Sequence, residues 1–325
     1  MLNGKNRIVW LGMVAIAIVL AIAIYIPTRA SIISSQDIKE NINASMDPDL
    51  PRPVDDPTAE ARKTVAAAGV KSYRETLPEW EGSFMIRESI TDAMKSWIKD
   101  NVSNQVRDQE AHRVYAARSG IKWRYDEFRL SKDEKVESVY STTWDGEQHR
   151  VYSQTATSQS AIIESSPKNR LYEEFYTIDQ LLTVAGLEKF DFDTAYYAGT
   201  TELNGRSVEC YARSTDTSWQ AVWLDPERGY APVKFIGGKH SPWTAAVRNE
   251  YSNWRQDEKG RWMPGRMVTR LRVPNQPELG KTIEITVSDF SRDISSDAFK
   301  GYKFPKGTKV SDRIRDKEYV LEEES

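Results

Sequence analysis

In the stretch QAVWLDPERGYAPVKF, residues 220–235, two apolar runs flank the charged tip DPERG. The tip contains Asp225-Pro226 and Gly229, which are turn-forming residues. Proline presets φ for the second position of a turn, and glycine adopts φ > 0 at little cost. The stretch therefore predicts a β-hairpin with a loop somewhat longer than the tight two-residue kind.

The same alternation of apolar and polar residues about a turn recurs through most of the chain. A strand is predicted over residues 80–90, and another in KTIEITVSDF, where Ile283, Ile285 and Val287 share one face. Further hairpins are predicted about the turns Ser119-Gly120, Asp145-Gly146, Asn204-Gly205 and Glu258-Lys259-Gly260. The tally is about ten strands in successive hairpins, which is typical of an antiparallel sheet.

Helices are predicted at a few places. Residues 57–77 are expected to be helical, because Asp56 is a good N-cap and Pro57 suits the first helical position. A second helix is predicted over residues 177–187. Residues 91–111 fit either a short amphipathic helix or an extension of the preceding strand. The predicted fold class is mainly β (α+β): a single, strongly curved antiparallel sheet, an unclosed barrel, with helices covering one face.

The amino terminus indicates a membrane segment. Residues 8–26 form an uncharged run, which as a helix would be about 28 Å long and would match the ~30 Å hydrocarbon core. Basic residues in the preceding residues 1–7 place that tail in the cytoplasm by the positive-inside rule. We expect a single-pass anchor in the inner (cytoplasmic) membrane, with the C-terminal domain in the periplasm or outside. The alternative is a signal peptide cleaved near Ala30.

Three segments follow the predicted transmembrane anchor. Residues 27–56 contain several prolines and few apolar residues, which predicts a flexible tether. Residues 57–315 form the predicted folded domain. Residues 316–325 form an acidic C-terminal tail.

Catalytic and metal-binding motifs are not evident in the sequence. The histidines His112, His149 and His240 lie far apart in polar contexts, and we expect them to be solvent-exposed. Zinc, nucleophile-elbow and phosphate-loop motifs are missing, and DFDTAY lacks the remaining ligands of a calcium loop. A net charge of −3 offers no concentrated basic face. We therefore expect no enzyme activity, metal, cofactor or nucleic-acid partner, and interpret the single cysteine, Cys210, as a small core residue.

Aromatic residues in the predicted strands give the stronger signal. A core is the simplest interpretation of each one alone. However, a single curved sheet cannot fill its own concave side, so helices or an apolar ligand must do so. Because two short helices would fill little of it, we hypothesise a partly open hydrophobic cavity. Strand alternation gives its candidate ligand-binding residues as Trp123, Tyr125, Trp144, Trp223, Ile283, Ile285 and Val287.

The order of these elements resembles the LolA/LolB-type outer-membrane lipoprotein-sorting superfamily, in particular its divergent membrane-anchored members. The resemblance covers roughly residues 57–315. Its motifs are structural turns and not a catalytic signature. They are GIKWRYDEF, TWDGEQHRVYS, GTTELNGRSVECYARS, AVWLDPERGYAPVKF, GRWMPGRMVTRLRV and AFKGYKFPKGTKVSDR. The resemblance implies an unclosed antiparallel barrel, with helices as a lid, that shelters the acyl chains of a lipoprotein or related lipid.

Residues and resemblance together suggest a carrier-like function. We expect a membrane-anchored extracytoplasmic protein that binds a lipid or lipoprotein acyl chain in its hollow, as a lipoprotein-sorting chaperone would. The partners are then the acyl chain and, through residues 8–26, the membrane. The alternative is a non-catalytic sensor or scaffold domain of the same fold that binds a protein partner at the envelope. A water-accessible apolar hollow would favour the first, and a packed interior with an outer apolar patch the second.

Overall fold

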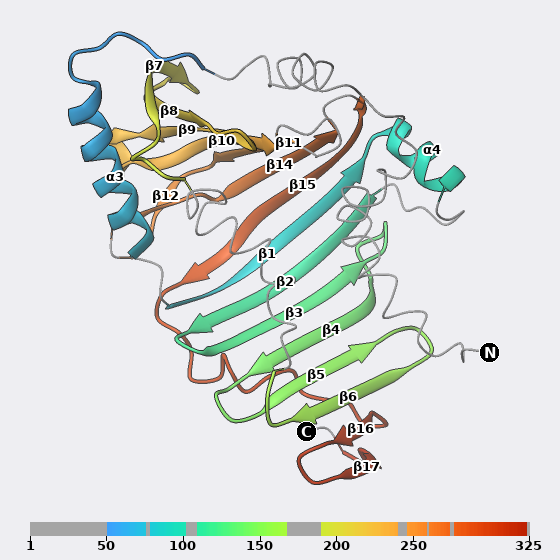
Figure 1. Ribbon diagram of the computed structural model, residues 1–325. Coiled ribbons are helices and arrows are strands. Elements are labelled where there is room, and N and C mark those ends of the chain that lie inside the picture. The colour runs from blue at the N-terminus through green and yellow to red at the C-terminus, as the bar shows by residue number, and fades with distance from the viewer. Residues whose placement is uncertain are drawn as a thin grey trace.

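One large, curved sheet dominates the chain (Figure 1). The structure is a computed structural model, and it describes residues 51–75, 79–101, 109–167, 190–239, 246–258, 260–273 and 276–323. Within these ranges the sheet has fifteen strands in the order β17-β16-β6-β5-β4-β3-β2-β1-β15-β14-β11-β10-β9-β8-β7. The sheet is therefore open in the described part of the chain, with β17 and β7 as its edges. The mainly β, unclosed fold class is confirmed.

The elements have the following bounds. The first half of the sheet contains β1 Glu79–Ile90, β2 Gln109–Ser119, β3 Lys122–Leu130, β4 Val136–Trp144, β5 His149–Gln154 and β6 Gln159–Glu164. The second half contains β7 Tyr196–Leu203, β8 Arg206–Ser214, β9 Ser218–Asp225, β10 Ala231–Lys239, β11 Ala246–Ser252, β14 Arg266–Val273, β15 Gln276–Ser291, β16 Lys309–Asp312 and β17 Lys317–Val320. A separate two-stranded ribbon joins β12 Arg255–Gln256 to β13 Trp262–Met263. The described helices are α3 Ala59–Glu75, α4 Asp92–Asn101 and the short 3₁₀ helix η4 Pro226–Arg228.

The hairpin of residues 220–235 is confirmed as β9 and β10, with η4 in its loop. Asp225 caps η4, because its side chain accepts a hydrogen bond from the Glu227 amide at 3.0 Å. Gly229 ends the turn with φ of 65°. The fully buried Asp225 also accepts from Arg206 Nε at 2.6 Å, which joins the NGR and DPERG turns. The Arg206–Asp225 pair therefore connects the two turn motifs in the folded structure.

The sheet has more strands than the ten or so predicted. The additional strands include β6 and the four-residue strands β16 and β17. β16 pairs with β6 in parallel, so the sheet is antiparallel except at this pair. All four residues of β17 are exposed. A strand this short and this exposed has no alternation of apolar and polar residues by which the sequence could predict it.

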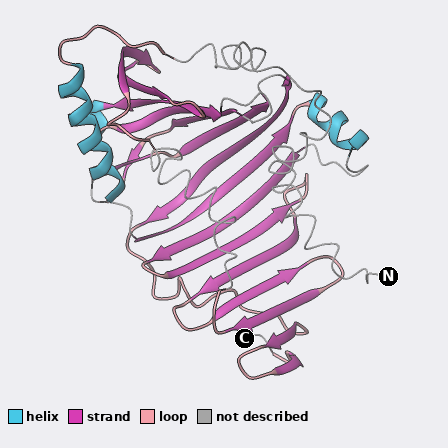
Figure 2. Cartoon of the chain, viewed as in Figure 1, coloured by secondary structure: helices cyan, strands magenta, loops and turns pink. Residues whose placement is uncertain are grey.

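Helix α3 lies beside the β7–β10 end of the sheet, and α4 lies near β15 (Figure 2). α3 confirms the predicted N-cap, because Asp56 Oδ1 accepts from the Thr58 amide at 2.7 Å just before the helix. Of the two alternatives for residues 91–111, the structure shows the helix: residues 92–101 form α4, and the next strand, β2, begins at residue 109. The apolar side of α4 packs beside β15, where Met94 contacts Leu279.

Several predictions lie outside the described residues. They are the membrane segment 8–26, the tail before it, most of the tether 27–56, the helix at 177–187 and His240. Within the described ranges, no helix combines the length and apolar character needed to span a bilayer.

Candidate functional site: the apolar face of the sheet

Alternate side chains of the strands form one extended cluster on a single face of the sheet. We call this surface the apolar face. It runs from α3 across β7–β11, β14, β15 and β1 to β4. Its buried members are Ala66, Val70, Trp80, Phe84, Ile86, Val114, Ala116, Trp123, Tyr125, Phe190, Ala195, Tyr197, Tyr211, Val222, Leu224, Phe235, Tyr251, Met263, Met267, Ile285 and Val287. The cluster spans both halves of the sheet and is larger than the other three apolar clusters of the described residues, which makes it the candidate binding surface.

Six of the seven candidate residues lie together at this face. Trp123, Tyr125, Ile285 and Val287 are buried in the cluster, and the partly buried Trp144 and Ile283 pack against it. These strands come from two distant parts of the chain, and β1 joins them by pairing with β15 on one side and β2 on the other.

Trp223 is the exception, and its placement at the same face is wrong. It belongs to a second cluster with Cys210, Trp219 and Ile236, on the opposite side of β8–β10. β9 is almost continuously buried from Trp219 to Asp225, so its alternation does not distinguish the two faces. Cys210 is confirmed as a buried core residue.

α3 covers one end of the apolar face. Its main contacts are with β7 and β10, through the buried Ala66 and Val70. Gly69 permits the close approach, because a Cβ at this position would lie 2.5 Å from Tyr230 Cδ2. The helix covers the β7–β10 end, and the cluster continues beyond it to Trp123.

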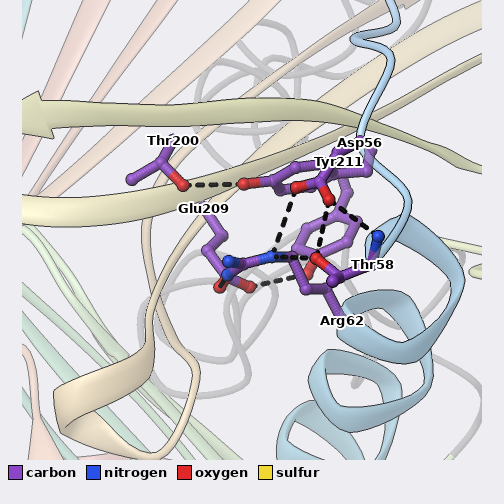
Figure 3. Close-up of polar contacts among 7 residues, drawn as sticks. Asp56, Thr58, Arg62, Thr200, Glu209 and Tyr211 are labelled. Atoms are coloured by element: carbon purple, nitrogen blue, oxygen red, sulfur yellow. Dashed lines mark hydrogen bonds and ion pairs between the residues drawn. The ribbon is translucent and has the colours of Figure 1, made fainter.

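A polar network fixes the first turn of α3 to the sheet (Figure 3). Arg62 Nη1 donates to Glu209 Oε1 at 2.7 Å, and the Tyr211 hydroxyl donates to Glu209 Oε2 at 2.7 Å. Arg62 Nε also donates to the Thr58 hydroxyl at 3.0 Å and lies 3.4 Å from Asp56 Oδ2. Glu209 is only 5% exposed, so the pair compensates a nearly buried charge.

Charged residues line the α4 side of the apolar face. His112 on β2 lies opposite Arg129 on β3, and its Nδ1 is 2.7 Å from Glu127 Oε1. Burial alone would lower the pKa of His112, but hydrogen bonds to Glu110 and Glu127 outweigh burial and raise the pKa to about 9. Burial tends to raise the pKa of Glu127, and the bond to His112 reverses this and lowers it. Arg129 also pairs with Glu110.

A second polar contact chain on this face contains His149, for which the predicted exposure is wrong. Its side chain is 2% exposed, because it lies between β4 and β6. Its Nε2 lies 2.9 Å from the Thr142 hydroxyl, and its Nδ1 lies 2.9 Å from Glu164 Oε1. Arg313 Nη1 donates to Glu164 Oε2 at 2.9 Å, which ties the segment after β16 to the sheet. This series of contacts joins a hydroxyl, an imidazole and a carboxylate. The residue that carries the hydroxyl, Thr142, is only 2% exposed.

The other side of the β4–β6 region is closed by the C-terminal segment. Tyr302 and Phe304 stack on Tyr152, with ring centroids 5.0 and 5.6 Å away. Val139 and Val310 complete this third cluster. Within the described ranges, no three potential metal-ligating side chains gather to form an ion site.

Comparison with known proteins gives structural similarity only. No protein-family profile and no curated protein matches the sequence. A putative outer-membrane lipoprotein-sorting protein domain from Vibrio parahaemolyticus is 12% identical, and the match covers 72% of this chain and 94% of that one, with a TM-score of 0.40. A DUF1329 family protein from Desulfovibrio piger is 13% identical, and the match covers 74% and 96%, with a TM-score of 0.41.

The MucA/MucB complex of Pseudomonas aeruginosa contains a more distant match. It is 10% identical and covers 71% of this chain and 99% of that one, with a TM-score of 0.18. All three are likenesses of structure at low sequence identity.

Proposed function

We propose that this chain binds the acyl chain of a lipid or lipoprotein on its apolar face, as a membrane-anchored, carrier-like protein of the envelope. The observation that carries the proposal is the extent of this face. It begins under α3 at β7–β10 and continues to Trp123 and Trp144, well beyond the strands that α3 mainly contacts. An extended apolar surface on a curved sheet suits a long, flexible hydrocarbon chain.

The energetics of such a ligand favour this kind of site. Each CH₂ group buried from water contributes about 0.8 kcal/mol, so a long acyl chain is held without any directional contact. Aromatic rings add broad, rigid contact area, which Trp80 and Phe84 supply on β1 and Trp123 and Tyr125 supply on β3. The proposal requires no chemical step, so the protein acts as a non-catalytic carrier.

The location follows from the predicted amino-terminal segment. Residues 8–26 would anchor the chain in the cytoplasmic membrane, and the sheet domain would lie in the periplasm. An anchored domain of this kind would receive or present an acyl chain near the membrane surface.

Tryptophan quenching tests the proposal, because the two faces carry equally buried tryptophans. Trp123 on the apolar face is 6% exposed, and Trp223 on the opposite face is 5% exposed. Bromine atoms on a fatty acid quench tryptophan fluorescence at short range. The full chain in amphipol is titrated with brominated stearate, and the Trp123→Phe and Trp223→Phe variants are compared with the unmodified chain.

We expect saturable quenching that Trp123→Phe reduces and Trp223→Phe leaves almost unchanged. Native mass spectrometry of the protein purified from membranes should also show a bound lipid. Ligand-free protein in repeated preparations, together with unquenched tryptophans, would contradict acyl-chain binding. A greater loss of quenching in Trp223→Phe than in Trp123→Phe would place the ligand on the face opposite the apolar face and contradict the proposal.

A further inference from the structure

Two buried polar side chains interrupt the apolar face. Asn249 on β11 and Thr269 on β14 lie directly opposite each other in the antiparallel register. They are 0% and 3% exposed. Asn249 is also opposite Phe235, and Thr269 is opposite Ile283. Since residues opposite one another share a side of a sheet, the pair belongs to the apolar face.

Each of these side chains retains an unused hydrogen-bonding atom. Among the described residues, neither Asn249 Oδ1 nor the Thr269 hydroxyl oxygen has a hydrogen-bond partner. Asn249 Nδ2 donates to the Tyr251 hydroxyl at 3.4 Å, which occupies the nitrogen end of the amide and leaves the oxygen end free. Buried polar atoms are almost always hydrogen-bonded, so two neighbouring exceptions need an explanation.

The chemistry of the pair defines what could bind there. Directly opposite residues of an antiparallel pair have Cβ atoms about 4.5–5.5 Å apart, so one small group can reach both side chains. A carboxamide oxygen only accepts hydrogen bonds, whereas a hydroxyl both donates and accepts. A complementary ligand must therefore supply an N–H or O–H for Asn249 and can offer a carbonyl oxygen to Thr269.

We propose that Asn249 and Thr269 recognise the amide of an N-acylated ligand whose hydrocarbon chain lies on the apolar face. This inference rests on the proposed acyl-chain binding. An acyl amide carries N–H and C=O on adjacent atoms, whereas an ester offers only acceptors and leaves Asn249 Oδ1 unpaired. Along β15, Ile285 and Val287 lie to one side of Ile283, and Lys281, paired with Glu88 at 2.7 Å, lies to the other. The acyl chain therefore runs toward Val287, and the polar part of the ligand toward Lys281.

A pair of ligands with the same hydrocarbon chain tests this assignment. Oleamide and methyl oleate are used to displace a fluorescent fatty acid from the full chain in amphipol. The variants are Asn249→Leu and Thr269→Val, with Thr143→Val as the matched control. Thr143 also has a buried hydroxyl without a partner in the described part of the chain, but it lies on the side of β4 that the C-terminal segment covers.

We expect the unmodified chain to bind oleamide about tenfold more tightly than methyl oleate, as one additional buried hydrogen bond would give. Asn249→Leu should reduce this preference to about twofold or less, because it removes the acceptor that only the amide N–H can use. Thr269→Val should weaken the binding of both ligands, since both offer a carbonyl oxygen to this hydroxyl, and Thr143→Val should change neither affinity nor preference. The midpoint of thermal unfolding should not fall in Thr269→Val relative to Thr143→Val, because neither hydroxyl is bonded to another described residue.

The outcomes separate this inference from the proposed function. If neither ligand displaces the probe, acyl-chain binding itself is wrong. If both bind equally well to the unmodified chain, acyl-chain binding stands and the amide site is wrong. Loss of the preference in Thr143→Val, or a lower unfolding midpoint in Thr269→Val than in Thr143→Val, would also overturn the amide site. The second result would show that the Thr269 hydroxyl is bonded to Asn249.

Discussion

Protonated His112 should stabilise the fold, and the stabilisation should disappear at alkaline pH. The side chain is 13% exposed, and its Nδ1 lies 2.7 Å from Glu127 Oε1. Its pKa is raised from 6.5 to about 9. A difference of about 2.5 pKa units at about 1.36 kcal/mol per unit corresponds to about 3 kcal/mol of folding free energy.

The direction of the pH dependence follows from the proton count. Between the unfolded pKa and the folded pKa, the folded chain holds a proton on His112 that the unfolded chain has released. The stabilisation is therefore complete below about pH 6.5 and is lost as pH rises through about 9. The lowered pKa of Glu127 reflects the same interaction and adds no second contribution.

The assay compares the unmodified chain with His112→Gln in urea unfolding from pH 6 to 9.5. The free energy of unfolding of His112→Gln should be about 3 kcal/mol lower at pH 6 and less than about 1 kcal/mol lower at pH 9.5. Tyrosine and cysteine titrations are common to both proteins and cancel in this difference. A difference that stays constant with pH would refute the reasoning, as would a His112 NMR titration with a midpoint near the ordinary value.

Three further predictions concern α3 and the buried thiol. Arg62→Met should lower the midpoint of urea unfolding, because it leaves the nearly buried Glu209 without its cation; a midpoint equal to that of the unmodified chain would show that the pair is unimportant. Gly69→Ala should destabilise the chain by about 1–3 kcal/mol, whereas alanine normally stabilises a helix, because its Cβ would meet Tyr230; a raised unfolding midpoint would contradict this. Cys210 should resist iodoacetamide at pH 8 until the chain unfolds, since burial raises the pKa of its thiol to about 12; rapid labelling of the folded protein, followed by mass spectrometry, would be the opposite result.

The sequence predicted the features that depend on neighbouring residues. Asn204-Gly205 and the DPERG loop form turns because their backbone needs φ > 0, which glycine and asparagine adopt readily. The N-cap at Asp56 and the alternation of β15 also depend on contacts within a few residues. These local rules were sufficient for the hairpins and the mainly β class. They also placed six of the seven candidate residues at one face.

The errors and omissions occur where distant segments meet. Because β9 is buried on both sides, the alternation of its residues does not show which way Trp223 points. The buried position of His149 depends on its contact with Glu164 from another strand. β16 reaches β6 across almost 150 residues, and a strand of only four residues does not reveal such a pairing in advance.

The sequence by itself determined where the strands turn, because turn conformation and side-chain alternation are properties of a few consecutive residues. Only the tertiary structure decided which side chains share a surface. It placed Arg62 against Glu209, and it placed Asn249 opposite Thr269, with the amide oxygen of one and the hydroxyl of the other unpaired among the described residues. The physical reason is that burial and hydrogen-bond satisfaction depend on strand order and register, which bring together residues with no local relation in the chain.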